Sequence, residues 1–225
     1  MSKNSLEEGV HVSIVETFGK AGVVPVIVIE KEEQAVPLAK ALVKGGLPVL
    51  EVTFRTTAAA GAIAAIRREV PEAIVGAGTL LTPQMVKDAK AAGAVFGVAP
   101  GFDPIVMAAA KAEDLSMCPG IATASELSQA LTAGCTMVKF FPAEAAGGVK
   151  MIKNLLGAFR FTGVRFMPTG GVNLSNVADY LAVPEIVCCG GTWIVPKDAL
   201  AAGDWAAIER LAADAAALVR KMRNS

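Results

Sequence analysis

Histidine and aromatic residues are scarce in this chain: among 225 residues there is one histidine, His11, and aromatics make up 5%. The four cysteines have none of the spacings of a zinc site; they are Cys118, Cys135, Cys188 and Cys189. A disulfide between the adjacent Cys188 and Cys189 would be strained. We therefore expect reduced, buried thiols, as is typical of a cytoplasmic protein.

An excess of charge of either sign is also absent, since 21 Lys and Arg residues balance 21 Asp and Glu residues. Such a balance gives no electrostatic attraction to nucleic acid or to an anionic membrane. The apolar runs are strand-sized, so none predicts a membrane span, and the N-terminus shows no signal peptide. We expect a cytoplasmic protein with neither nucleic acid nor membrane as a partner. If the protein binds an anion, individual side chains or backbone N–H groups at the site must bind it, because the overall charge gives no attraction.

One pattern recurs along the whole chain: a short apolar segment of β character, followed by an Ala-rich segment of helical character. With 53% hydrophobic residues and no low-complexity linker, we expect residues 1–225 to form a single domain. The predicted strands are 23–29, 48–54, 73–79, 94–100, 115–121, 136–142, 164–170 and 185–192. The predicted helices between them are 32–44, 57–69, 82–92, 103–113, 123–133, 148–157 and 173–181.

Eight strand–helix units predict an α/β fold, a single (β/α)8 TIM barrel. Residues 5–19 predict an N-terminal helix that closes the bottom of the barrel, and the tail from Asp204 predicts an amphipathic closing helix. A doubly wound open sheet is the alternative. It would more often carry a Gly-rich dinucleotide turn after its first strand, and residues 26–33 (VIVIEKEE) contain none. The barrel is therefore favoured.

Charged residues occupy strand positions where a barrel interior is normally apolar. Glu51, Thr53 and Arg55 alternate with apolar residues in the second strand, and Lys139 is the lone charge of the sixth. If the apolar set faces the helices, these side chains point inward. A purely structural ion pair of Glu51 with Lys139 or Arg55 is one interpretation. Buried pairs rarely stabilise more than apolar replacements do, so we favour a nucleophilic Lys139 beside a carboxylate that transfers protons.

The strand ends carry small and polar residues on the face where barrel active sites are built. The third, fourth, seventh and eighth strands close with Thr79, Pro100, Thr169 and Thr192. Two loops after strands seven and eight carry the glycine pairs Gly170-Gly171 and Gly190-Gly191. Glycine pairs let backbone N–H groups converge on an anion. The sequence therefore predicts a phosphate site in these two loops.

Six segments together resemble the 2-keto-3-deoxy-6-phosphogluconate (KDPG) aldolase and 4-hydroxy-2-oxoglutarate aldolase family. They are residues 50–56 (LEVTFRT), 75–79 (VGAGT), 119–123 (PGIAT), 138–144 (VKFFPAE), 168–172 (PTGGV) and 190–196 (GGTWIVP). The resemblance runs from about Val23 to the C-terminal helix. It implies a class I, Schiff-base aldolase that needs no metal or cofactor and is active as a homotrimer. The single histidine, in the N-terminal segment away from any strand end, agrees with a metal-free site.

The resemblance also implies a role for each motif residue. Lys139 is the Schiff-base lysine and Glu51 the general acid and base. Arg55 and Thr79 hold the substrate carboxylate, and the pocket is lined by Phe141, Pro100 and Thr169. The phosphate is bound by Gly170, Gly171, Gly190, Gly191 and the hydroxyl of Thr192. Glu144, just beyond the lysine strand, either touches the site or only opens the next helix.

The implied reaction is a carbon–carbon lyase reaction that cleaves KDPG to pyruvate and glyceraldehyde 3-phosphate. Side activity on 4-hydroxy-2-oxoglutarate is expected, because the pyruvate half would be recognised identically. The nearest alternative is an aldolase for 2-keto-3-deoxy-6-phosphogalactonate. Two other classes remain open: a phosphosugar isomerase barrel without covalent catalysis, and a non-catalytic barrel in which Lys139 merely pairs with Glu51.

Overall fold

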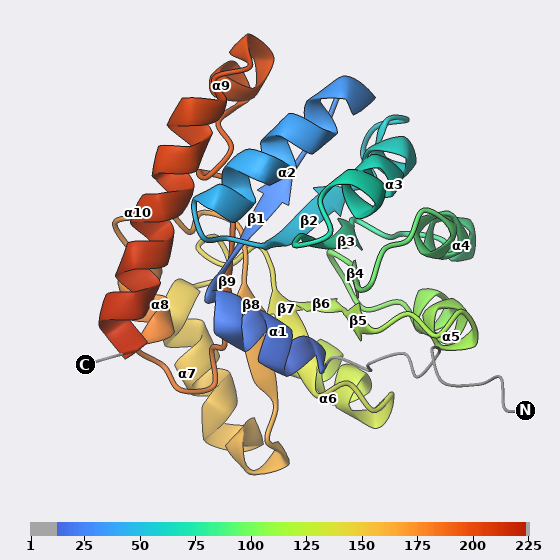
Figure 1. The fold of residues 1–225 in the computed structure, drawn as a ribbon. Coiled ribbons are helices and arrows are strands. Elements are labelled where there is room, and N and C mark those ends of the chain that lie inside the picture. The colour runs from blue at the N-terminus through green and yellow to red at the C-terminus, as the bar shows by residue number, and fades with distance from the viewer. Residues whose placement is uncertain (1–12, 224–225) are drawn as a thin grey trace, which may run out of the picture.

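The structure, a computed structural model, describes residues 13–223 as an α/β fold built on a curved parallel sheet (Figure 1). The α/β class predicted from the sequence is confirmed. The strands are β1 (Val23–Ile27), β2 (Val49–Thr53), β3 (Ile74–Gly78), β4 (Gly97–Val98), β5 (Met117–Cys118), β6 (Gly120–Ile121), β7 (Met137–Phe140), β8 (Arg165–Pro168) and β9 (Cys189–Gly191). Each lies inside a segment that the apolar pattern predicts.

The described strands form two parallel groups whose order follows the chain. Six strands are hydrogen-bonded in the order β5-β4-β3-β2-β1-β9, and three in the order β6-β7-β8. Isolated parallel bridges join Phe166 to Ile186 and Thr169 to Gly190, between the two groups. At the other junction, only Pro119 separates β5 from β6. The two groups together curl around a common interior (Figure 1).

All the strands are shorter than the sequence predicts, and three of the predicted strands depart most from their predicted ranges. The predicted strand 115–121 is divided into β5 and β6 because Pro119 has no N–H to donate to a ladder. The Pro119 carbonyl still accepts a hydrogen bond from the Lys139 backbone N–H at 2.8 Å. The predicted strand 94–100 pairs only over β4, and the predicted strand 185–192 only over β9 and the Ile186 bridge.

Helices surround the curved sheet: most lie along its outside, and the first lies across one end (Figure 1). They are α1 (Ile14–Ala21), α2 (Ala35–Lys44), α3 (Ala59–Glu69), α4 (Pro83–Ala91), α5 (Pro104–Ala112), α6 (Ala124–Thr132), α7 (Gly148–Phe159), α8 (Val177–Leu181), α9 (Lys197–Ala202) and α10 (Trp205–Arg223), with 3-10 turns η1 (Glu32–Gln34) and η2 (Arg160–Thr162). No helix within residues 13–223 has an apolar stretch long enough to cross a bilayer. The short α9 was not predicted.

Helix ends agree with the sequence in some places and differ in others. Helix α5 begins within one residue of the predicted helix 103–113: the Asp103 carboxylate accepts from the Ile105 N–H at 2.8 Å, and Pro104 follows as the first helical residue. Helix α8, predicted from residue 173, begins only at Val177. The reason is local, because the Asn173 carboxamide accepts from the Ser175 N–H at 2.9 Å and favours a turn.

Helix α1 covers the interior at the end from which the strands begin. Its Phe18 is completely buried and meets Phe96 edge-on, with ring centroids 4.8 Å apart. Both rings belong to a second apolar cluster, which also contains Met137, Met167 and Cys118 from the inner face of the strands. The part of the predicted helix 5–19 that precedes residue 13, with His11, lies outside the described residues.

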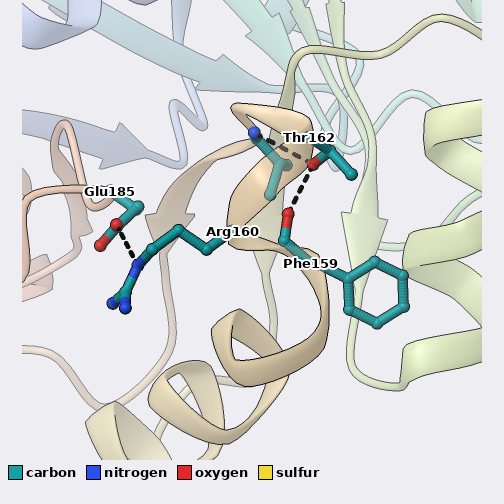
Figure 2. Close-up of polar contacts among 5 residues, drawn as sticks. Phe159, Arg160, Thr162 and Glu185 are labelled. Atoms are coloured by element: carbon teal, nitrogen blue, oxygen red, sulfur yellow. Dashed lines mark hydrogen bonds and ion pairs between the residues drawn. The ribbon is translucent and has the colours of Figure 1, made fainter.

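The same end carries an ion pair that is remote from the carboxyl ends of the strands. Figure 2 shows Arg160 donating to Glu185, with 2.7 Å between Nε and Oε1. Next to it, the Thr162 hydroxyl donates to the Phe159 carbonyl at 2.7 Å and closes the turn before β8. The Arg160 hydrogen bond holds the pKa of Glu185 below its usual range, although burial opposes it. This pair ties the α7–β8 connection to the start of the last strand segment.

The capping box of α6 gives a testable pH dependence of stability. Glu126 Oε2 accepts from the Ala122 and Thr123 N–H groups at 2.7 and 2.8 Å. These hydrogen bonds lower the Glu126 pKa below its usual value of 4.5, and the bond from the Ala122 N–H has the largest effect. The resulting stabilisation is present above the unfolded-state pKa and is lost as pH falls through the folded-state pKa.

We therefore expect Glu126→Gln to lower the free energy of unfolding at pH 7, and the difference from wild type to shrink as pH falls below 4.5. Urea unfolding at a series of pH values measures both quantities. Glu72→Gln, which alters an exposed carboxylate, is the control and should give a small difference throughout. A Glu126→Gln difference that grows on acidification would contradict the capping argument.

Candidate active site

Lys139 and Glu51 meet inside the curved sheet. Lys139 comes from β7 and Glu51 from β2, strands that belong to the two different hydrogen-bonded groups. Lys139 Nζ lies 3.3 Å from Glu51 Oε1. Glu51 is 0% exposed and Lys139 4% exposed. Of the two partners that the sequence allowed for Glu51, the structure therefore selects Lys139, and the predicted inward direction of both side chains is confirmed.

The surroundings of this pair are tight and apolar. A Cβ placed on Gly78 would lie 2.2 Å from Glu51 Oε1, so only glycine leaves room for the carboxylate. Lys139 Nζ lies 5.4 Å from the centre of the Phe141 ring. Cys118 is fully buried, and burial raises the pKa of its thiol, so it stays uncharged below the pair. All four cysteines are buried and free, as predicted.

One oxygen of Glu51 has no hydrogen-bond partner in the described residues. Oε2 is buried and unpaired, while Oε1 faces Lys139. A buried polar atom in a native protein usually has a partner, in the protein or in an ordered water molecule. A carboxylate that leaves one oxygen free beside an amine is suited to receive and return protons. The geometry thus favours proton transfer over a purely structural pair.

Arg55 lies at the rim, two residues beyond the end of β2, and its side chain is exposed. The hydroxyls of the two neighbouring threonines fix the backbone around it. Thr53 donates to the Ile27 carbonyl at 2.8 Å, and Thr56 donates to the Ile29 carbonyl at 2.5 Å. Arg55 is therefore presented from an anchored turn, which limits the entropy that it loses on binding an anion.

Thr79 follows β3 in a strained backbone conformation, with φ +60°. A β-branched residue rarely adopts this left-handed region, which costs about 1–3 kcal/mol. The hydrogen bonds on either side hold it there: the Phe54 N–H donates to the Gly78 carbonyl at 2.8 Å, and the Leu80 N–H donates to the Val98 carbonyl at 3.1 Å. Such strain is concentrated at functional sites, and it was not visible in the sequence.

Pro100 and Thr169 complete the inner lining at the strand ends. A Cβ on Gly120 would lie 2.1 Å from the Pro100 carbonyl oxygen, so the two strand ends meet closely. Thr169 is 4% exposed. Its Oγ1 has no hydrogen-bond partner among residues 13–223 and lies where a Cβ on Gly190 would be only 2.2 Å away. This hydroxyl is thus a buried polar group that the described residues leave without a hydrogen bond.

The turn Gly170-Gly171 has backbone angles that favour glycine, with φ +99° and +81°. The side-chain amides of Asn173 and Asn176 both donate to the Gly171 carbonyl at 3.1 Å. These two contacts fix the orientation of the Gly171 carbonyl. From the sequence, Asn173 marked only the expected start of a helix and Asn176 was not assigned to this turn, although asparagine side chains often hydrogen-bond to nearby backbone in turns.

The second glycine pair adjoins the first through the bridge between Thr169 and Gly190. A Cβ on Gly191 would lie 2.2 Å from the Trp193 ring, so the indole packs directly on this glycine. Thr192, between them, is exposed. The two predicted phosphate loops therefore lie side by side. No three His, Cys, Asp or Glu side chains within residues 13–223 cluster as ligands for a metal ion.

We expect Lys139→Met to lower the free energy of unfolding by about 3 kcal/mol, because Glu51 is then left buried without its partner. The double variant Glu51→Leu/Lys139→Met should recover most of that loss. Urea unfolding measures both variants. Lys153→Met, at an exposed position of α7, is the matched control and should change stability by less than about 0.5 kcal/mol. Equal losses in the single and double variants would refute a coupled buried pair.

Comparison with known proteins places this site in a family. The family model described as "Aldolase: KDPG and KHG aldolase" matches residues 14–211. The KHG/KDPG aldolase of Escherichia coli K12 is 52% identical over 193 residues, which are 86% of this chain and 90% of that protein.

Solved structures agree. A KDPG aldolase from Legionella pneumophila, with pyruvate captured as a covalent carbinolamine, has a TM-score of 0.85 and 42% identity, over 88% of this chain and 96% of that one. The KDPG aldolase of Zymomonas mobilis ZM4 with 3-phosphoglycerate has a TM-score of 0.84 and 43% identity, over 91% and 96%. The resemblance inferred from the six sequence segments is confirmed, and the chain belongs to the KDPG and KHG aldolase family.

Proposed function

We propose that this chain is a class I aldolase, a carbon–carbon lyase that cleaves KDPG to pyruvate and glyceraldehyde 3-phosphate through a Schiff base on Lys139. The observation that carries the proposal is the buried contact of 3.3 Å between Lys139 Nζ and Glu51 Oε1. The Legionella enzyme that holds pyruvate as a covalent carbinolamine supports the same chemistry. No cofactor is needed, because an iminium ion acts as the electron sink.

We also propose that the curved sheet closes as a single (β/α)8 barrel over residues 1–225, with α1 at its bottom. The bridge between Thr169 and Gly190 supports closure on one side, and the contact between β5 and β6 around Pro119 supports it on the other. Lys139 and Glu51 reach each other across the interior, which a flat sheet would not allow.

The covalent step begins when Lys139 passes a proton to Glu51 and attacks the C2 ketone as a free amine. Glu51 then returns the proton to the departing C2 hydroxyl, which leaves as water and gives a protonated imine. Base removal of the proton from the C4 hydroxyl breaks the C3–C4 bond, and its electron pair moves into the iminium to form an enamine. Glyceraldehyde 3-phosphate leaves with C4 as its aldehyde carbon.

The cycle closes with the proton that Glu51 took from the C4 hydroxyl. Returned to C3 of the enamine, this proton gives the pyruvate iminium, and water then releases pyruvate and the free amine. One residue can serve every step because its Oε2 is unpaired in the described structure while Oε1 faces the lysine. In this scheme Glu51 is the general acid and base at each proton transfer.

The substrate carboxylate is assigned to Arg55 and Thr79, which follow neighbouring strands β2 and β3. A guanidinium can hold a carboxylate with two parallel hydrogen bonds and so orient the ketone toward the lysine. Pro100, Phe141 and Thr169 line the pocket between this clamp and the lysine. The Phe141 ring, 5.4 Å from Nζ, helps to exclude water from the imine.

The phosphate is assigned to the two adjacent glycine turns, with the residues Gly170, Gly171, Gly190, Gly191 and Thr192. Backbone N–H groups of such turns suit an anion, and the Thr192 hydroxyl is exposed to donate one more hydrogen bond. The Zymomonas relative bound to 3-phosphoglycerate supports a phosphate site in this family. Compared with a serine at position 192, Thr192 adds a methyl group beside the proposed phosphate.

Side activity on 4-hydroxy-2-oxoglutarate follows from the shared pyruvate half, and the Escherichia coli relative is named for both substrates. The second candidate is an aldolase for the C4 epimer, 2-keto-3-deoxy-6-phosphogalactonate. Parallel assays of the two epimers decide between them. We further propose a homotrimer in the cytoplasm, whose main ligands are the phosphorylated keto acid, pyruvate and glyceraldehyde 3-phosphate.

Borohydride reduction in the presence of pyruvate tests the covalent step. We expect a stable pyruvate adduct, and peptide mass analysis should place it on Lys139, because a reduced imine cannot hydrolyse. Lys139→Ala should give no adduct, whereas Lys153→Ala, which alters an exposed lysine of α7, should be trapped like the wild type. An unmodified wild-type protein would contradict the proposal and favour a non-covalent isomerase or a binding protein, and an adduct on another lysine would remove the assignment to Lys139.

Glu51→Gln tests the proton transfers. Loss of a general acid and base costs about 10²- to 10⁴-fold in rate, so kcat for KDPG should fall by that order while the protein stays folded. A coupled assay of pyruvate release measures it. Glu33→Gln, at an exposed position on η1, is the control and should keep the wild-type kcat. An unchanged kcat in Glu51→Gln would remove this residue from the mechanism.

A further inference from the structure

We propose that Glu144 and Tyr180 are a positioning pair that holds the Gly170-Gly171 turn in the shape that grips the substrate phosphate. This inference rests on the proposed function and deepens its phosphate site. Glu144 lies in the loop after the lysine strand β7, and Tyr180 lies on α8. Neither residue touches the reacting atoms in the mechanism above, so both act through the turn.

The two side chains are joined by a hydrogen bond in which Tyr180 Oη donates to Glu144 Oε1. Tyr180 is 1% exposed. Burial raises the pKa of its phenol, and the bond to Glu144 raises it further, so the hydroxyl keeps its proton and remains a donor. A buried hydroxyl that loses its partner costs about 1–3 kcal/mol. The Glu144 side chain is thus anchored at its carboxylate.

The stem of the anchored side chain lies directly against Gly171. A Cβ on Gly171 would be only 2.5 Å from Glu144 Cγ and 2.7 Å from Glu144 Cβ. The Glu144 backbone N–H also donates to the Gly170 carbonyl at 3.0 Å. One residue therefore holds both glycines of the turn, through its main chain and its side chain. On the other side, the amides of Asn173 and Asn176 hold the Gly171 carbonyl.

The same loop links this turn to the lysine strand. The Ala143 N–H donates to the Thr169 carbonyl at 2.8 Å, and the Gly148 N–H donates to the Ala143 carbonyl at 2.9 Å. A Cβ on Gly148 would lie 3.3 Å from Glu144 Oε1 and 3.4 Å from Tyr180 Oη, so the loop folds closely over the pair. The pair thereby sets the position of the phosphate turn relative to Lys139.

The negative charge of Glu144 is unfavourable beside a phosphate dianion, so its contribution must come from geometry. Glutamine keeps an acceptor oxygen for Tyr180 and the same stem against Gly171, but it carries no charge. Phenylalanine at position 180 keeps the ring and removes the donor. The two substitutions therefore separate the geometry of the pair from its charge. Comparing a substrate that has a phosphate with one that lacks it distinguishes an effect on the turn from an effect on the rest of the site.

The experiment compares kcat/KM for KDPG and for 4-hydroxy-2-oxoglutarate, which lacks the phosphate. In Tyr180→Phe we expect kcat/KM for KDPG to fall about tenfold, mainly through KM, which corresponds to about 1.4 kcal/mol. The value for 4-hydroxy-2-oxoglutarate should change by less than about twofold, because the pyruvate half of the site is untouched. Glu144→Gln should stay close to wild type on both substrates. Inhibition by inorganic phosphate should weaken in Tyr180→Phe alone.

Glu185→Gln is the matched control, because it removes the negative charge from the Arg160–Glu185 pair at the other end of the strands (Figure 2). This variant should lower the free energy of unfolding measured in urea. It should leave the ratio of kcat/KM for the two substrates unchanged. Equal losses on both substrates in Tyr180→Phe, or no loss, would overturn the inference, as would Glu144→Gln behaving like Tyr180→Phe. If Tyr180→Phe does not fold, Glu144→Ala is tested in its place, and the same selective loss of kcat/KM for KDPG is expected. A wild type that cleaves neither substrate contradicts the proposed function instead.

Discussion

The rest of the site depends on the buried contact between Lys139 and Glu51. Its two strands, β7 and β2, belong to separate hydrogen-bonded groups, so the contact exists only because the sheet curves until its inner faces meet. Two charged groups at 0% and 4% exposure would destabilise an ordinary core. Their mutual contact limits that penalty, and Gly78 leaves the space that the carboxylate needs. The interior thus accommodates a buried amine together with its carboxylate partner.

Around this contact, hydrogen bonds to the backbone determine the conformation of the loops at the carboxyl ends of the strands. Threonine hydroxyls pin the turn that carries Arg55, and ladder hydrogen bonds pin Thr79 in a strained conformation. Glycines 190 and 191 admit Thr169 and Trp193 against the main chain. The other end of the strands serves stability: Phe18 and Phe96 close the interior, and Arg160 pairs with Glu185. Chemistry and stability are therefore separated along the strand direction, as is usual in folds of this class.

The two ends of the proposed substrate are served by different parts of the rim, and the segment 141–148 connects them. It begins beside Lys139, passes under Gly170, and ends at the start of α7. Through this arrangement one residue of the segment, Glu144, contacts the Gly170-Gly171 turn that we propose for the phosphate, without taking part in the proposed chemistry. From the sequence, Glu144 allowed both a site contact and a helix-entry role, because a carboxylate in a loop shows no partner until Tyr180 is brought beside it by α8.

The sequence by itself determined the α/β class, the eight apolar segments and the inward direction of Glu51 and Lys139, because alternation along a strand is a local property. The family motifs predicted roles for the site residues, and those roles remain proposals. Only the tertiary structure decided which cation Glu51 meets, since Arg55 and Lys139 were both possible and only curvature brings β7 opposite β2. It also decided the strain at Thr79, the break at Pro119 and the later start of α8. Each of these depends on hydrogen bonds to neighbouring strands or turns, which no single segment contains.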